Sequence, residues 1–90
     1  MVWRLGGLSE AIVMVNVDIG KEDEVFNKLL ELPEVMEIYM VYGVHDIIVI
    51  LRAQDMDTMR SVITQKIRKI NGVKSTVTSI VIKKQVKSSQ

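Results

Sequence analysis

The chain has 90 residues, of which 48% are hydrophobic, and its formal net charge at pH 7 is +1. This length corresponds to one small domain, and the nearly neutral charge argues against duplex DNA as a partner, because phosphate binding needs an excess of Lys and Arg. The absence of cysteine excludes disulfides, thiolate metal sites and cysteine nucleophiles. Since only four residues are aromatic (one Trp, two Tyr, one Phe), Val, Ile, Leu and Met must build the core, and we expect part of this aliphatic surface to be buried against a second copy.

The two ends of the chain differ from its middle. No apolar run approaches the roughly 20 residues that span a bilayer, and the start has no signal-peptide core, so we expect a cytoplasmic protein. Residues 1–9, which contain Trp3 and the pair Gly6-Gly7, are expected to form a flexible leader. The folded domain is expected over residues 10–83, and residues 84–90 form a polar, basic tail.

The first half of the chain predicts a strand and a helix. Residues 11–18 alternate, with one wholly apolar face made of Ala11, Val13, Val15 and Val17. Gly20 ends this strand, and the acidic residues within Lys21–Glu24 favour a helix start, where amide dipoles attract negative charge. Apolar residues then recur at helical spacing and form one stripe: Val25, Phe26, Leu29, Leu30 and Leu32. Pro33 ends the helix.

Two β-branched runs, residues 35–41 and 47–51, flank a short break and predict a β-hairpin. In that break, Gly43 can take a positive φ, and the Asp46 carboxylate can accept hydrogen bonds from turn amides.

The second half repeats the first in outline. Asp55 is a plausible N-cap of a second helix, and its apolar side consists of Met59, Ile63, Ile67 and Ile70. Asn71-Gly72 ends this helix, and residues 73–82 form the last strand. The order strand, helix, strand, strand, helix, strand predicts an α+β ferredoxin-like fold, in which two helices cover one face of a four-stranded antiparallel sheet.

The second face of that sheet predicts a homodimer. If Ile47, Val49 and Leu51 point at the helices, then Ile48 and Ile50 point away from them, beside Met14 and Ile80. Burying four such side chains contributes roughly 6–12 kcal/mol before the entropy of association is subtracted, so we expect two sheets to pack face to face.

The hairpin carries the motif Val35-x-Glu37-x-Tyr39-x-x-x-Gly43-x-x-Asp46. Within this element order, the motif resembles the C-terminal effector domain, or RAM domain, of the Lrp/AsnC family over about residues 10–83. The resemblance implies dimers that pack through their sheets, further assembly into octamers, and binding of amino acids or related effectors between subunits. Regulators of this family carry an N-terminal helix-turn-helix, for which a first strand at residue 11 leaves no room. The chain therefore resembles stand-alone members, so we expect no direct binding to nucleic acid, and a full-length regulator of the family is a candidate partner.

The candidate ligand contacts follow from that resemblance: Tyr42, Gly43, His45, Asp46, Thr76, Thr78 and Ser79. A carboxylate such as that of Asp46 can hold the ammonium group of an amino acid, while amides and hydroxyls hold its carboxylate. The structural alternatives are turn architecture for Gly43 and Asp46, an ordinary surface histidine for His45, and a solvated strand for the hydroxyls. We expect no cofactor, no metal and no catalytic residues.

Two other function classes stay open at this point. Small ferredoxin-like dimers also include isomerases and cofactor-free monooxygenases, for which His45, Asp46 and Tyr39 or Tyr42 could supply acid and base groups. Sealed aliphatic packing on the outward sheet positions argues against such a cavity. RNA recognition on a four-stranded sheet needs exposed aromatic residues on the central strands, and the first and third predicted strands have none.

Overall fold

The computed structural model describes residues 8–88. Its elements are β1 (Ser9–Val17), α1 (Glu22–Leu30), β2 (Val35–Met40), β3 (Ile47–Ala53), α2 (Met56–Ser61), η2 (Val62–Ile67), which continues α2, and β4 (Val73–Ile80). This is the predicted ferredoxin-like order. Trp3, Gly6 and Gly7 of the expected leader lie outside the described residues.

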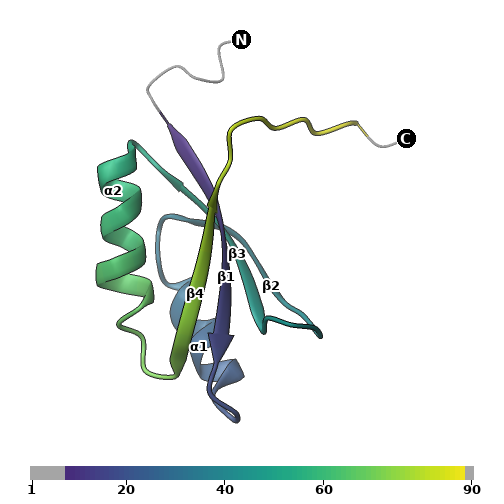
Figure 1. Cartoon of the computed structure of the whole chain (residues 1–90), viewed down its shortest axis with the longest axis vertical. Coiled ribbons are helices and arrows are strands. Elements are labelled where there is room, and N and C mark those ends of the chain that lie inside the picture. Colours follow the sequence, from purple (N-terminus) through teal and green to yellow (C-terminus); the bar gives the residue numbers. More distant parts are fainter. Residues whose placement is uncertain (1–7, 89–90) are drawn as a thin grey trace.

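The four strands form one antiparallel sheet in the order β2-β3-β1-β4. Figure 1 shows this sheet with α2 running along β4 and α1 near the end at which β1 stops. Both helices pack on the same face, because their buried side chains share one core with alternate residues of β1 and β3. The other face, which we call the open face, is not covered by any described helix.

Strand alternation builds the core as predicted. Ala11, Val13, Val15 and Val17 of β1 are buried together with Ile47, Val49 and Leu51 of β3. Met59, Ile63 and Ile67 are buried on the side of the second helix that faces the sheet, also as predicted. The prediction for Leu30 was wrong, because it lies one residue beyond Leu29 and is turned about 100° away from the buried stripe, which leaves it 54% exposed.

The second helix begins as expected and then widens. The Asp55 side chain caps it by accepting a hydrogen bond from the Thr58 amide at 2.7 Å. From Val62 onward the helix takes i→i−5 hydrogen bonds, shown by the Arg68 amide donating to the Ile63 carbonyl at 3.0 Å. Ile70 falls beyond the helix and is only half-buried.

Two predictions about the turns can be compared with the backbone. Gly72 has the left-handed φ expected of it, +104°, and Gly20 has a φ of +88°. The prediction that Asn71-Gly72 ends the second helix was wrong, because η2 ends at Ile67 with Arg68 as its right-handed C-cap, and Gly72 lies in the turn before β4. The expectation of a positive φ at Gly43 was wrong. The β2–β3 connection is closed by the Val41 amide donating to the Asp46 carbonyl at 2.9 Å, and the longer loop between them needs no left-handed residue.

The register of β4 changes one predicted face. Ile80 pairs with Ala11, whose side chain points to the helices, so Ile80 lies on the helix face and not beside Met14 as expected. Val77 pairs with Met14 and takes that position on the open face. Within residues 8–88, no helix is long and apolar enough to cross a membrane.

Candidate functional site

The open face has an apolar middle. Ile12 pairs with Ile50 and Met14 pairs with Ile48, and all four side chains are half-buried in the single chain. Val77 extends the strip onto β4, where it is 46% exposed. These five residues, which we call the apolar strip, are bordered by polar groups at both ends of the sheet.

A hydrogen-bonded cluster lies at the end of the strip next to the β2–β3 turn. The Asn16 amide nitrogen Nδ2 donates to Ser75 Oγ at 2.9 Å, and Asn16 Oδ1 lies 3.1 Å from His45 Nδ1. With Oδ1 as acceptor, Nδ1 of His45 carries the hydrogen, and Nε2 of the neutral ring is an acceptor that can face a ligand. We call these three residues the Asn16 cluster.

Asp46 links the turn to the end of β1. Its amide donates to the Val15 carbonyl at 3.1 Å, and its carboxylate Oδ2 accepts from the Val17 amide at 2.8 Å. The partner is thus a strand amide, where the sequence predicted amides of the turn itself. None of the hydrogen bonds among residues 8–88 uses Asp46 Oδ1, so this oxygen can accept a bond from a bound ligand.

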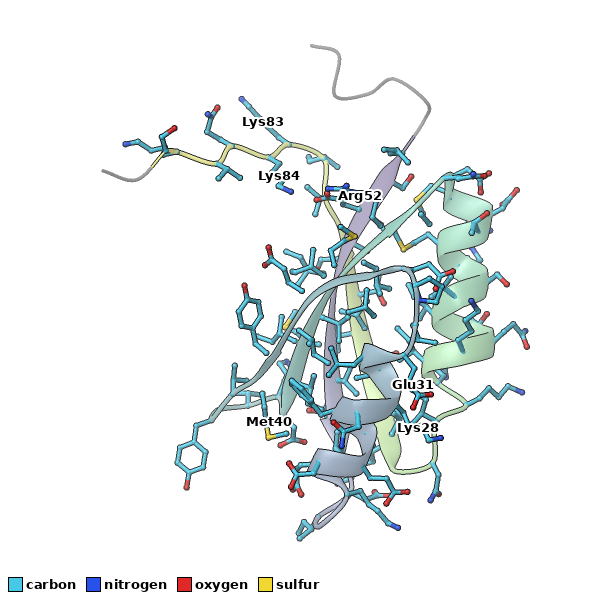
Figure 2. The ribbon with its side chains drawn as sticks, turned by 180° about the vertical axis from the view of Figure 1, so that it is seen from behind. Lys28, Glu31, Met40, Arg52, Lys83 and Lys84 are labelled. Carbon is cyan, nitrogen blue, oxygen red and sulfur yellow. The ribbon has the colours of Figure 1, made fainter. Side chains whose placement is uncertain are left out.

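Tyr42 and Gly43 lie in the projecting part of the same turn. The Tyr42 side chain is fully exposed, and apart from Gly43 and its two chain neighbours no described atom lies within 4 Å of the position that a Cβ would take at Gly43. In Figure 2 the segment that follows Met40 extends away from both helices. These two residues are therefore near the Asn16 cluster in sequence but are not fixed against it in a single chain.

The three predicted hydroxyl residues of β4 lie on two faces. Thr76 and Thr78 pair with Val15 and Val13, which places them on the helix face, whereas Ser79 pairs with Ile12 on the open face. Thr78 lines a shallow hollow of about 210 Å³ with Ile80 and residues of the second helix. These hydroxyls do not form one patch with Asp46, and their role as ligand contacts stays a prediction.

Sequence reasoning missed Asn16 and Ser75 as site residues. Asn16 follows Ile12 and Met14 on the same side of β1, so an amide in an apolar row was the available signal. Ser75 could not be paired with Asn16 without the register of β4.

Tyr39 does not suit a role as catalytic base. Its hydroxyl donates to Glu37 Oε1 at 2.6 Å, and this hydrogen bond together with the carboxylate charge raises the pKa of Tyr39 above its usual value. The phenol thus stays protonated at neutral pH. In the described part of the chain, no group of three or more His, Asp or Glu residues is placed to hold a metal ion. The central strands β1 and β3 carry no aromatic residue that could stack on RNA bases.

Comparison with known proteins assigns the chain to a family. The sequence profile of the Lrp/AsnC ligand binding domain matches residues 10–90. The chain belongs to the Lrp/AsnC family. The expected resemblance is thereby confirmed, and the chain contains a ligand-binding regulatory domain of that family.

The sequence relatives are named as transcriptional regulators. HTH-type transcriptional regulator FL11 of Pyrococcus furiosus is 33% identical over 73 residues, which cover 81% of this chain and 48% of FL11. The uncharacterized HTH-type transcriptional regulator PF1231 of the same organism is 37% identical over 70 residues, or 78% of this chain and 47% of PF1231. The chain thus spans about half the length of the curated relatives it matches.

Solved structures share the fold. FFRP-DM1 is 40% identical with a TM-score of 0.80, and the match covers 82% of this chain and 99% of that one. AsnC of E. coli has a TM-score of 0.88 at 23% identity, covering 100% of this chain and 61% of AsnC, which shows a common fold.

Proposed function

We propose that this Lrp/AsnC domain senses an amino acid or a related small molecule in the cytoplasm. In this proposal, the ligand binds between subunits and changes how the chain assembles with itself or with a full-length regulator of the family. Transcription or amino-acid metabolism responds to that change. The observation that carries the proposal is the Asp46 carboxylate, which is held at the end of β1 next to the Asn16 cluster and whose Oδ1 has no hydrogen bond to any of residues 8–88.

The chemistry of this end of the sheet suits an α-amino acid. Asp46 Oδ1 offers a charged acceptor to the ligand ammonium, and amides of the adjoining turn can bind the ligand carboxylate. His45 and Ser75, tied together through Asn16, add adjustable donors and acceptors. Tyr42, Gly43 and Ser79 are further candidate contacts at the open face and its turn, whereas Thr76 and Thr78, on the helix face, could contact a ligand only from that side of the sheet.

The apolar strip supports the assembly part of the proposal. Five aliphatic side chains lie side by side on the open face, and packing them against a second copy removes them from water. We infer a homodimer that packs through its sheets, with octamers as the next level of assembly.

The class of ligand can be narrowed before any screen. The transcriptional regulator NMB0573 of Neisseria meningitidis, solved as a complex with L-Met, shares the fold with a TM-score of 0.80 at 19% identity, and the match covers 90% of this chain and 54% of NMB0573. That ligand belongs to NMB0573, but it makes L-Met and other apolar amino acids the first to test here.

A thermal-shift screen against the twenty amino acids tests the proposal. A ligand that binds only the folded assembly must raise the unfolding temperature, and we expect one or a few amino acids to do so. Indifference to all twenty, in the dimeric protein, would contradict an amino-acid effector.

A further inference from the structure

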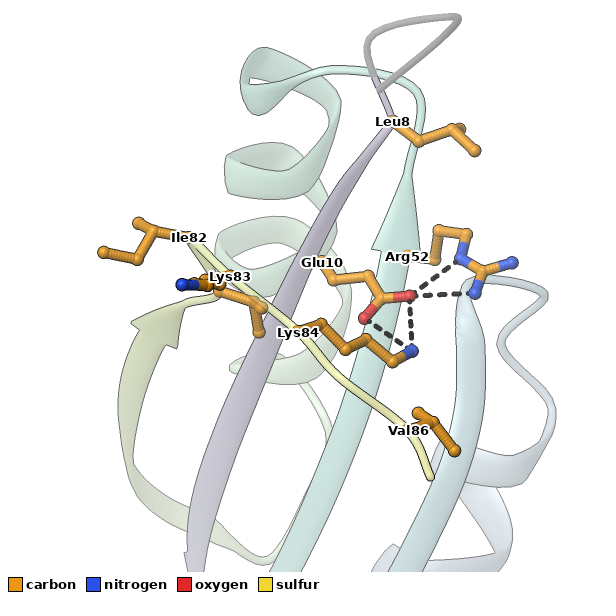
Figure 3. A pocket seen from close by; sticks show the side chains of 8 residues that line it. Leu8, Glu10, Arg52, Ile82, Lys83, Lys84 and Val86 are labelled. Carbon is orange, nitrogen blue, oxygen red and sulfur yellow. Dashed lines mark hydrogen bonds and ion pairs between the residues drawn. The ribbon is translucent and has the colours of Figure 1, made fainter. Parts of the chain in front are cut away.

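A cavity lies at the opposite end of the sheet from Asp46. This cavity of about 450 Å³ is located where β1 starts and β3 and β4 end. Figure 3 shows it, and its lining residues are Leu8, Glu10, Arg52, Val81, Ile82, Lys83, Lys84 and Val86. Asn16 and Asp46 make their hydrogen bonds at the other end of β1, so this cavity shares no residue with the proposed effector site.

The centre of the cavity is an ion cluster around Glu10, whose side chain is 16% exposed. Arg52 donates to Glu10 Oε2 from Nη2 at 2.8 Å and from Nε at 3.1 Å. Lys84 Nζ lies 3.1 Å from Oε1 and 3.2 Å from Oε2. Burial by itself would raise the pKa of Glu10, but the hydrogen bonds and charges of Arg52 and Lys84 outweigh it and lower the pKa. The carboxylate is therefore ionised at neutral pH.

Positive charge remains after Glu10 is neutralised. The lining holds three cations (Arg52, Lys83, Lys84) against one carboxylate, a net charge of +2. In the single chain the Arg52 and Lys84 side chains are 41% and 50% exposed, so both can reach a ligand there while they hold Glu10. Arg52 uses two of its five N–H donors on Glu10, and its Nη1 makes no hydrogen bond within residues 8–88.

The rest of the lining is aliphatic. Leu8, Val81, Ile82 and Val86 provide it, and Ile82 and Val86 are 87% and 73% exposed. Figure 3 shows the segment after β4 crossing the strands, with Lys84 turned toward Glu10 and Val86 farther along the same segment. The Val81 amide donates to the Glu10 carbonyl at 2.9 Å, which fixes the start of this segment on β1.

We propose that this cavity binds a small aliphatic carboxylate. The ligand carboxylate lies between Arg52 and Lys84, and its hydrocarbon chain packs on Leu8, Val81 and Val86. The excess positive charge selects an anion over a neutral molecule or an amine, and the aliphatic wall selects a chain longer than that of acetate. The site is separate from the proposed effector site and does not depend on it.

An NMR titration of the full chain with hexanoate tests the proposal, with hexylamine and sodium acetate as matched probes at equal ionic strength. We expect millimolar hexanoate to shift the amide signals of Glu10, Arg52 and Lys84, while those of Asn16 and Asp46 stay in place. Equal shifts with hexylamine, or shifts spread over the apolar strip, would overturn the proposal, because they would indicate general hydrophobic adsorption.

Substitution of one cation of the cavity tests whether its charge contributes to ligand binding without disturbing the fold. Lys84→Gln keeps most of the side-chain length and leaves Arg52 on Glu10, and we expect it to weaken hexanoate binding roughly tenfold. Lys66→Gln is the control, because Lys66 pairs with Glu34 at 3.1 Å, is 44% exposed and lies outside the cavity. Unchanged hexanoate affinity in Lys84→Gln would overturn the proposal. An Asp46→Asn variant should bind hexanoate normally, so failure of the amino-acid site would not be mistaken for failure here.

Discussion

At the scale of single residues, three glycines allow the cost of a positive φ to be distinguished from the cost of a steric clash when alanine replaces glycine. Gly72 has a φ of +104°, and a Cβ there would lie 2.9 Å from Lys21 Cβ and Val25 Cγ2. Gly20 has a φ of +88° but open space around it, and Gly43 has open space without a positive φ. Gly72→Ala should therefore lower the free energy of unfolding most, by about 1–3 kcal/mol or more. Gly20→Ala should cost about 1 kcal/mol, and Gly43→Ala less than about 0.5 kcal/mol.

Urea unfolding of the three variants measures this order. If Gly43→Ala destabilised the chain as much as Gly72→Ala, the backbone assignment of the β2–β3 turn would be contradicted.

Glu10 predicts a pH dependence of stability. Because its pKa is lower in the folded chain, its ion cluster contributes stability above the unfolded pKa of about 4.5, and this contribution is lost as the pH falls through the folded pKa. Glu10→Gln lacks this pH-dependent contribution to stability. The urea concentration at its unfolding midpoint should therefore fall less between pH 7 and pH 3 than that of the unchanged chain. Parallel pH profiles for the two proteins would show that the cluster does not contribute to folding.

Local signals allowed some single residues to be predicted from the sequence. Asp55 could be identified as an N-cap and Gly72 as a left-handed residue, because both properties depend on a few neighbours along the chain. The backbone of Gly43 could not, because it depends on where the Val41–Asp46 hydrogen bond closes the turn. The contact of His45 with Asn16 spans 29 positions and required the tertiary structure.

At the scale of elements, the second helix depends on its cap. Only Met56–Ser61 is regular α-helix before the backbone widens, so the Asp55–Thr58 hydrogen bond holds the start of a short element. Asp55→Ala should lower the unfolding temperature by a few degrees, because the Thr58 amide loses its acceptor. Asp55→Asn keeps a side-chain oxygen and should retain most of the stability. Differential scanning calorimetry measures both, and equal losses would mean that the cap acts through charge alone.

Element faces were predictable only where one face is clearly apolar. β1 and β3 alternate strictly, so their buried sides followed from the sequence, as did the antiparallel layout. β4 mixes Thr, Ser and Val, which leaves its register open, and this is why Ile80 was assigned to the wrong face. The widened η2 segment was not predicted from the sequence, and it buries Val62 next to Ile63.

At the scale of the whole molecule, the apolar strip is the surface through which we propose that the chain assembles. Ile50→Asp would place an unpaired charge at its centre, opposite Ile12, and should weaken self-association at least about a hundredfold. Ile19→Asp is the control, because Ile19 is 95% exposed in the loop between β1 and α1. Analytical ultracentrifugation should find Ile50→Asp monomeric and Ile19→Asp unchanged. A monomeric unchanged chain at micromolar concentration would contradict the dimer.

Isothermal titration calorimetry on Asp46→Asn tests the central claim most directly. Asparagine keeps an oxygen for the Val17 amide, so the fold is preserved, but the charge that would hold a ligand ammonium is removed. With the amino acid that stabilises the unchanged chain, we expect Asp46→Asn to bind at least about tenfold more weakly. Asp57→Asn, changed at a side chain that is 94% exposed on α2, should bind normally. Equal affinity in all three proteins would show that Asp46 does not bind the effector and would contradict the account.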